Sequence, residues 1–121
     1  GLTMAIPSRV LAAGNAPLST EVICGVVAAG LTATGTNLAT ALQLSADVNV
    51  VATTAASTGV ALPDSEAGSQ SVVFNNGANS LTVYARTGQT VDGAASVAIA
   101  AGKERIFFGI SPTIWLSHLG A

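Results

Sequence analysis

The side chains able to carry acid–base or nucleophilic chemistry are few in this chain of 121 residues, and its only histidine is His118. Nucleophilic catalysis needs a base held against the nucleophile, and no pattern around His118 predicts an element that would hold it in this way. We therefore expect His118 at a solvent-exposed position or in an interface.

The six acidic residues are spread along the chain, and no two of them have a spacing that identifies a glycosidase pair. Asp64 and Glu66 are close neighbours in a predicted turn, where their oxygens could bind a hard cation. The D-x-D-x-D-G pattern of a calcium loop is missing around them, so a solvated turn is the favoured interpretation. No metal site is expected.

The segment AIAAGKE contains the Gly-Lys pair that ends a phosphate-binding loop. Val97 stands at the position of the first glycine, and Glu104 replaces the serine or threonine that binds the metal. Alternating charges at the tip of a β-turn are the better interpretation of residues 103–105. Since GxSxG, HExxH and CxxC patterns are also missing, we expect no enzyme activity and no cofactor.

The composition predicts a chain that associates with other chains. Half of the residues are hydrophobic and only 8% are charged, against roughly 25% charged residues in an ordinary soluble domain. Aromatic residues make up 4%, so the core consists mostly of aliphatic side chains that each bury a small area. Because so thin a core leaves a monomer marginal, burial of surface between copies is the natural remedy.

The same composition does not support binding to nucleic acid or to a membrane. The net charge is −2 and the four basic residues form no run, whereas nucleic-acid binding depends on clustered Lys and Arg. The most apolar stretch, VICGVVAAGL, is about half as long as the roughly 20 residues of a spanning helix. Cys24, the only cysteine, is expected there as a small buried side chain. The N-terminal stretch lacks the basic and long apolar parts of a signal peptide.

Residues 1–20 are expected to form an extended arm, and residues 21–121 a single all-β domain. Pro7, Gly14 and Pro17 interrupt the short apolar pieces of the arm and disfavour a helix. An arm of this kind can cover the apolar surface of a neighbouring copy. A frayed terminus is the alternative interpretation.

Alternation of side chains predicts β-strands through most of the domain. Val48 and Val50 alternate with Asn49 in one such strand. Residues 38–46 are rich in Ala and Leu, so one or two helical turns are an alternative there. Residues 63–68 have the composition of a turn or loop.

The clearest local signal is SQSVVFNNGANSLTVYA, in which two β-rich runs flank NNGAN. It predicts a hairpin with Asn76 and Gly77 at the tip, because both residues tolerate a positive φ. In the second run Leu81, Val83 and Ala85 are expected to share one buried face.

The last third of the chain continues the β pattern. Gly88, Asp92 and Gly93 predict further turns, a strand pair is expected around residues 101–103, and TIWLS is expected as the last strand. Strands spaced at roughly 8 to 12 residues with Gly-rich turns predict a small antiparallel sandwich or barrel-like module.

Over residues 31–116 the chain resembles a module of structural proteins in tailed-phage virions. The shared pattern is ATALxLxxxxN, then G, LP and G, then VxNxGANxLxVYxxxGxxIDG and a final AG. Val91 stands where the pattern has Ile. The matching landmarks are Thr40, Ala41, Leu42, Asn49, Leu62, Pro63, Gly68, Asn76, Gly77, Ala78, Asn79, Leu81, Val83, Tyr84, Asp92, Gly93, Ala101 and Gly102.

The resemblance implies an all-β module that forms a homotrimer, either as a capsid decoration (cement) protein or at the base of a head or tail fibre. The stretch MAIPSRVLAAGN is similar to the short starts of free-standing members, which favours a decoration protein. Such a protein is made in the host cytoplasm and binds the major capsid protein on the outer surface of the capsid. The alternative is a fibre module that binds a host surface or glycan. Candidate contact residues are Ile6, Pro7, Arg9, Val10 and Leu11 in the arm, with Tyr84 and Trp115.

Overall fold

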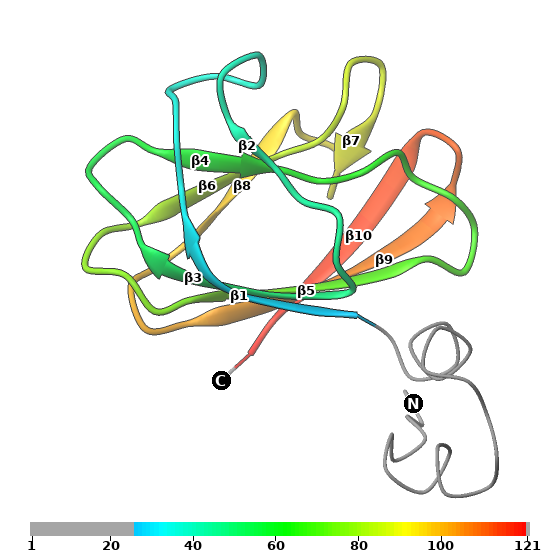
Figure 1. Cartoon of the computed structure of the whole chain (residues 1–121). Helices are drawn as coiled ribbons and strands as arrows, with labels where there is room; N and C mark the ends of the chain where they lie inside the picture. The colour runs from blue at the N-terminus through cyan, green and yellow to red at the C-terminus, as the bar shows by residue number, and fades with distance from the viewer. Residues whose placement is uncertain (1–25, 121) are drawn as a thin grey trace, which may run out of the picture.

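A computed structural model describes residues 26–120 of the chain, which form β-strands and turns without a helix. The strands make two sheets that face each other as two layers (Figure 1). The prediction of an all-β module is therefore confirmed. The described residues contain no helix that is long and apolar enough to cross a membrane.

The larger sheet has six strands in the order β1-β3-β5-β9-β10-β7, and the smaller sheet has four in the order β2-β4-β6-β8. The strands are β1 (Val27–Thr32), β2 (Leu42–Gln43), β3 (Val48–Thr53), β4 (Gly59–Ala61), β5 (Gln70–Asn75), β6 (Leu81–Tyr84), β7 (Thr90–Val91), β8 (Ser96–Ile99), β9 (Glu104–Ser111) and β10 (Ile114–Leu119).

From β1 to β6 the chain winds as a coil and passes to the opposite sheet with each new strand (blue to green in Figure 1). β1, β3 and β5 are parallel neighbours in the larger sheet. β2, β4 and β6 are parallel neighbours in the smaller sheet. Parallel neighbours need a crossover connection, and here each crossover contains the strand of the other sheet. The sheets are therefore mixed, where the sequence pattern predicted antiparallel neighbours.

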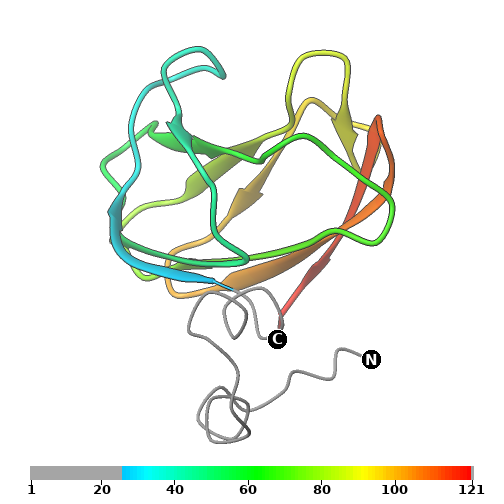
Figure 2. The same ribbon diagram turned by 45° about the vertical axis from the view of Figure 1, so that its right-hand side comes forward.

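The second half of the domain closes this coil with antiparallel pairs. β8 pairs with β6 in the smaller sheet, and β9 pairs with both β5 and β10 in the larger one. The last strand, β10, also carries β7 as a short parallel neighbour. The β9–β10 hairpin, orange and red, is seen from a second side in Figure 2. The prediction of TIWLS as the last strand is confirmed.

The segment predicted to be a hairpin instead connects the two sheets. β5 and β6 form on either side of NNGAN, but β5 pairs with β3 and β9, whereas β6 pairs with β4 and β8. The strand pair predicted around residues 101–103 is divided in the same way, because β8 and β9 belong to different sheets. The predicted shared face of Leu81, Val83 and Ala85 is confirmed, since all three are buried.

Asn75, the fully buried last residue of β5, explains why the chain changes sheets at this turn. Its side-chain Nδ2 donates to the carbonyl oxygens of Asn79 (2.8 Å) and Ile99 (2.9 Å). Its Oδ1 accepts from the hydroxyl of Thr54 (2.8 Å) and from the backbone N–H of Gly77 (3.1 Å). Because Ile99 belongs to the smaller sheet, one side chain of the larger sheet holds the two layers together.

Gly77 is required by close packing rather than by its own dihedral angle. Its φ is not among the positive values of the chain. A Cβ atom at this position would lie 2.5 Å from the backbone nitrogen of Thr54, so any larger residue would push the turn away from the strand that it covers. The reason for glycine thus differs from the positive φ expected from the sequence.

The turn predicted at Asp92 and Gly93 has the geometry that its residue types suggest. Both residues have positive φ, 51° and 82°, and Val91 and Ala94 exchange backbone hydrogen bonds of 2.8 and 2.9 Å across them. Asp-Gly is a preferred pair for such a two-residue turn because it accepts positive φ at both positions.

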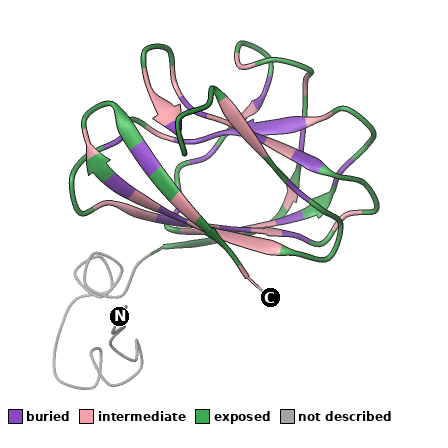
Figure 3. Ribbon diagram, turned by 180° about the vertical axis from the view of Figure 1, so that it is seen from behind, coloured by how far each residue is buried: buried purple, intermediate pink, exposed green. Residues whose placement is uncertain are grey.

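The core lies between the two sheets and is aliphatic apart from two aromatic side chains. Buried and less buried residues alternate along the long strands, as Figure 3 shows in purple against pink and green. This alternation places every second side chain in the core. The core side chains with no exposed area include Val51, Val60, Leu62, Val73, Leu81, Val83, Val91, Ile99, Phe107 and Trp115.

Candidate functional site

The outer face of the six-stranded sheet is apolar, although it is turned away from the core. Most side chains that alternate with buried residues on β3, β5 and β9 are themselves valine, isoleucine or phenylalanine, and the polar exceptions are Gln70 and Glu104 at the starts of β5 and β9. We call this surface the association face and define it by eight residues whose strand register places them on it: Val27, Val48, Val50, Val72, Phe74, Ile106, Phe108 and Leu116.

Strand register brings these side chains together in continuous rows. Val27 on β1 pairs with Val48 on β3, which pairs with Val72 on β5, and Val72 pairs with Ile106 on β9. The row ends on β10, where His118 is the partner of Ile106. Paired residues of neighbouring strands lie about 5 Å apart on the same face. Four aliphatic side chains therefore form an unbroken strip across four strands.

Two further rows flank this strip. On one side Val50 pairs with Phe74, and on the other side Phe108 pairs with Leu116. Val27 is 65% exposed and Leu116 is 48% exposed, while the other residues of the face are half-buried by their neighbours.

The hairpin end of the sheet extends the apolar surface beyond these rows. Ile110 and Ile114, in the strands on either side of the β9–β10 turn, are also exposed large side chains. Scattered exposed apolar residues are normal, whereas residues gathered on one face of a sheet make that face a candidate interaction surface.

The outer face of the smaller sheet has a different character. Its rows contain Gln43, Ala61, Tyr84 and Ser96, at paired positions on four strands. The Tyr84 hydroxyl donates to the carbonyl oxygen of Thr36 at 2.9 Å. This sheet is therefore covered by its own chain and by small or polar side chains.

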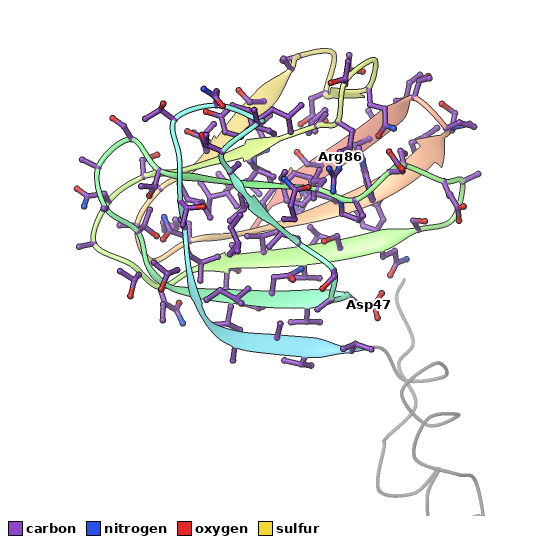
Figure 4. The ribbon with its side chains drawn as sticks, turned by 45° about the horizontal axis from the view of Figure 1, so that its top comes forward. Asp47 and Arg86 are labelled. Atoms are coloured by element: carbon purple, nitrogen blue, oxygen red, sulfur yellow. The ribbon has the colours of Figure 1, made fainter. Side chains whose placement is uncertain are left out.

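Two charged residues of the described chain bind the backbone at a strand end and in a connecting segment. Asp47 accepts the backbone N–H of Val26 at 2.8 Å, which fixes the entry into β1. Arg86 donates from Nε to the carbonyl oxygen of Leu62 at 2.9 Å. Figure 4 shows these two side chains on well-separated parts of the molecule. Each of the two therefore binds a main-chain group of the fold.

Within residues 26–120, the polar cluster that most resembles catalytic machinery is Asp92, Arg105 and Ser117. Asp92 accepts from the backbone N–H of Ser117 (2.8 Å) and from its hydroxyl. Arg105 donates to that hydroxyl (2.8 Å), and its guanidinium lies 3.8 Å from the Asp92 carboxylate. His118, as the next residue of β10, points to the opposite face of the strand. The cluster thus fastens the Asp92 turn to β10, because the Asp92 carboxylate binds both the backbone N–H and the hydroxyl of Ser117.

The predicted acidic pair does not converge on a cation site. Asp64 accepts a hydrogen bond from the Gln89 side chain at 3.0 Å, and Gln89 in turn accepts the backbone N–H of Ser65. Both Asp64 and Glu66 are exposed. Within residues 26–120, no group of three or more His, Cys, Asp or Glu residues is placed to hold a metal ion.

The structure places the predicted contact residues in three different situations. Trp115 is fully buried in the core, so its indole cannot touch a partner of the folded chain, and we remove it from the contact set. Tyr84 is half-buried and lies on the smaller sheet. The predicted arm contacts lie outside the described residues; these are Ile6, Pro7, Arg9, Val10 and Leu11.

The sequence did contain a signal for the association face that the strand prediction left unused. In residues 72–74 and 106–108 every side chain is apolar, whichever way it points. A strand with only one buried face alternates apolar and polar residues, whereas a continuous apolar run is typical of a strand buried on both faces. These two runs therefore indicated a second covered face on the central strands β5 and β9.

Comparison with known proteins adds no relative to this description. No model of a known protein family, no curated protein and no solved structure matches the chain.

Proposed function

We propose that this chain is a non-catalytic structural protein of a phage particle. It forms a homotrimer, binds the major capsid protein on the outer surface of the capsid, and stabilises the shell by adding contacts between coat subunits. The observation that carries the proposal is the association face, an apolar outer sheet surface in a chain with only 8% charged residues. The location on a phage capsid depends on the resemblance of residues 31–116 to virion modules.

The polar side chains support a structural role because they hold the fold together. Asn75 joins the two sheets, and Ser117 fastens the Asp92 turn to the last strand. Binding of such a rigid module to the assembled capsid stabilises it by mass action, in proportion to occupancy. The mechanism needs no chemical step.

The competing proposal is a head- or tail-fibre module that binds a host surface or glycan. Sugar recognition depends on open aromatic faces, and Trp115 is fully enclosed by the core while the hydroxyl of Tyr84 is bonded to the main chain. The two aromatic residues that this competing proposal would use therefore give it no support.

The test compares particles that lack this chain with the same particles after purified chain is added back. Release of DNA on heating, followed with an intercalating dye, should occur at a higher temperature in the decorated particles. Survival of osmotic shock should rise in parallel, and microscopy should show added density on the outside of the capsid. Particles that neither bind the chain nor gain resistance would overturn the proposal.

A further inference from the structure

We propose that the copies of the homotrimer contact one another through the association face, turned toward the threefold axis, with Val72 and Ile106 at the centre of the contact. The inference deepens the self-association part of the proposed function and does not depend on capsid binding. The occupant of the face is a second copy of the chain, which presents the same rows of aliphatic and aromatic side chains.

The apolar area on this side of the sheet suits a specific interface. Val27, Leu116, Ile110 and Ile114 are between 40% and 65% exposed, and six further side chains of the face are half-buried. Together they offer on the order of 500 Å² of apolar surface, at the upper end of what a monomer usually exposes in one patch. Each partner in a standard interface buries about 800 Å². The apolar part of the association face alone therefore amounts to more than half of the area that one partner of a standard interface buries.

The scarcity of charge on the face favours a partner whose surface is equally apolar. Among the described residues, Glu104 and His118 are the ionisable side chains in these rows, and both stand at row ends. A strongly charged partner finds no complementary charge at the centre. A second copy brings an equally apolar surface, and two such faces exclude water from each other without stranding a charge.

The position of the face within the sheet determines the mode of contact. β5 and β9 have strand neighbours on both sides, so their backbone groups are already paired and cannot accept an added strand. Contact over these strands must therefore occur through side chains that stand out from the sheet. The smaller sheet offers no equivalent surface, because Gln43, Tyr84 and Ser96 occupy its outer row.

The test places a charge at two positions of the face in the full chain. Val72→Lys introduces an ammonium group at the centre of the aliphatic strip, and Leu116→Lys does so at a position that is already 48% exposed, where folding is least disturbed. Gln43→Lys, at an exposed site on the other sheet, is the matched control. Sedimentation equilibrium gives the mass of each protein, and far-UV circular dichroism confirms that each is folded.

The wild-type chain and Gln43→Lys should sediment as a trimer, at three times the chain mass of 11.8 kDa, at micromolar concentration. Both lysine variants of the face should raise the dissociation constant on the order of a hundredfold or more, as a change at an interface hot spot does. A wild-type chain that stays monomeric, as it would if its own N-terminal residues or a coat subunit covered the face, would overturn the inference. So would a folded Leu116→Lys variant with wild-type mass.

Capsid binding is measured separately on the same proteins. If the chain forms oligomers through this face but does not bind capsids, the capsid proposal is refuted and the proposed self-association is supported. If the chain is monomeric but binds capsids, the self-association is refuted and the capsid proposal is supported.

Discussion

Replacement of Asn75 by alanine tests how the two sheets are held together. The Asn75 side chain is fully buried and takes part in four hydrogen bonds, two as donor and two as acceptor. Asn75→Ala removes all four and leaves the hydroxyl of Thr54 and the carbonyl oxygen of Ile99 without their partner in a buried region. The change cannot be repaired locally, because Ile99 lies in the smaller sheet and Thr54 follows a strand of the larger one.

The size of the expected loss in the free energy of unfolding follows from the number of hydrogen bonds removed. A net contribution of about 1 kcal/mol for each hydrogen bond gives a loss of about 4 kcal/mol in the free energy of unfolding. Since 1 kcal/mol corresponds to about 4–8 °C in a domain of this size, the melting temperature should fall by roughly 20 °C. Such a loss is a large part of the 5–15 kcal/mol that keeps a typical domain folded.

Asn76→Ala is the matched control. Asn76 is exposed, and its backbone N–H donates to the carbonyl oxygen of Val51 at 2.9 Å, a bond that alanine retains. This variant should stay within about 0.5 kcal/mol of the wild type. Urea denaturation and thermal melting of the three proteins, at one protein concentration, provide the comparison. Equal stability of the Asn75 and Asn76 variants would show that the turn does not depend on the buried amide.

Further predictions concern the turns. Gly77→Ala should lower the free energy of unfolding by about 2 kcal/mol, because the added methyl group would lie 2.5 Å from the backbone nitrogen of Thr54. Gly102→Ala should lower the free energy of unfolding by only about 1 kcal/mol, since its φ is +76° but its methyl group meets open space. Urea denaturation curves that rank the two variants in the opposite order would contradict the packing argument. Ser117→Ala removes the hydroxyl that donates to Asp92 and should cost about 1 kcal/mol, with increased hydrogen exchange in the Asp92 turn; unchanged exchange would show that the hydroxyl does not hold this turn.

The strands themselves were predictable because their signal is local. Alternation in LTVYA predicted that Leu81, Val83 and Ala85 share a buried face, and all three are buried. The Asp92-Gly93 turn was predictable for the same reason, since its geometry depends on two adjacent residues that tolerate positive φ.

The assignment of strands to sheets was not predictable from such signals. A hairpin and a connection between two sheets both consist of two β-rich runs around an Asn- and Gly-rich turn. The two arrangements differ in the hydrogen-bond partners of Asn75, which here are Ile99 in the opposite sheet and Thr54 in the preceding turn of the coil. These residues lie 24 and 21 positions away in the sequence, beyond the reach of any local pattern.

For the association face the sequence does contain a signal, but that signal does not identify which chain covers the face. The apolar runs at residues 72–74 and 106–108 indicate that the central strands are covered on both faces. One face is covered by the smaller sheet, as the burial of Val73 and Phe107 shows. An apolar run has the same sequence whether the second face is covered by the same chain or by another one, because the hydrophobic effect depends on buried apolar area and not on which chain buries it.

The two faces of the larger sheet also connect folding to assembly. Val72, Val73 and Phe74 are consecutive residues of β5, so the strand that places Val73 in the core necessarily presents its neighbours to the outside. Formation of the core therefore creates the association face. A partner that binds only the folded chain stabilises it by mass action. Under the proposed self-association, the thin aliphatic core and the apolar outer face would be parts of one arrangement, in which a chain with few charges would gain from its copies the burial that its own small core lacks.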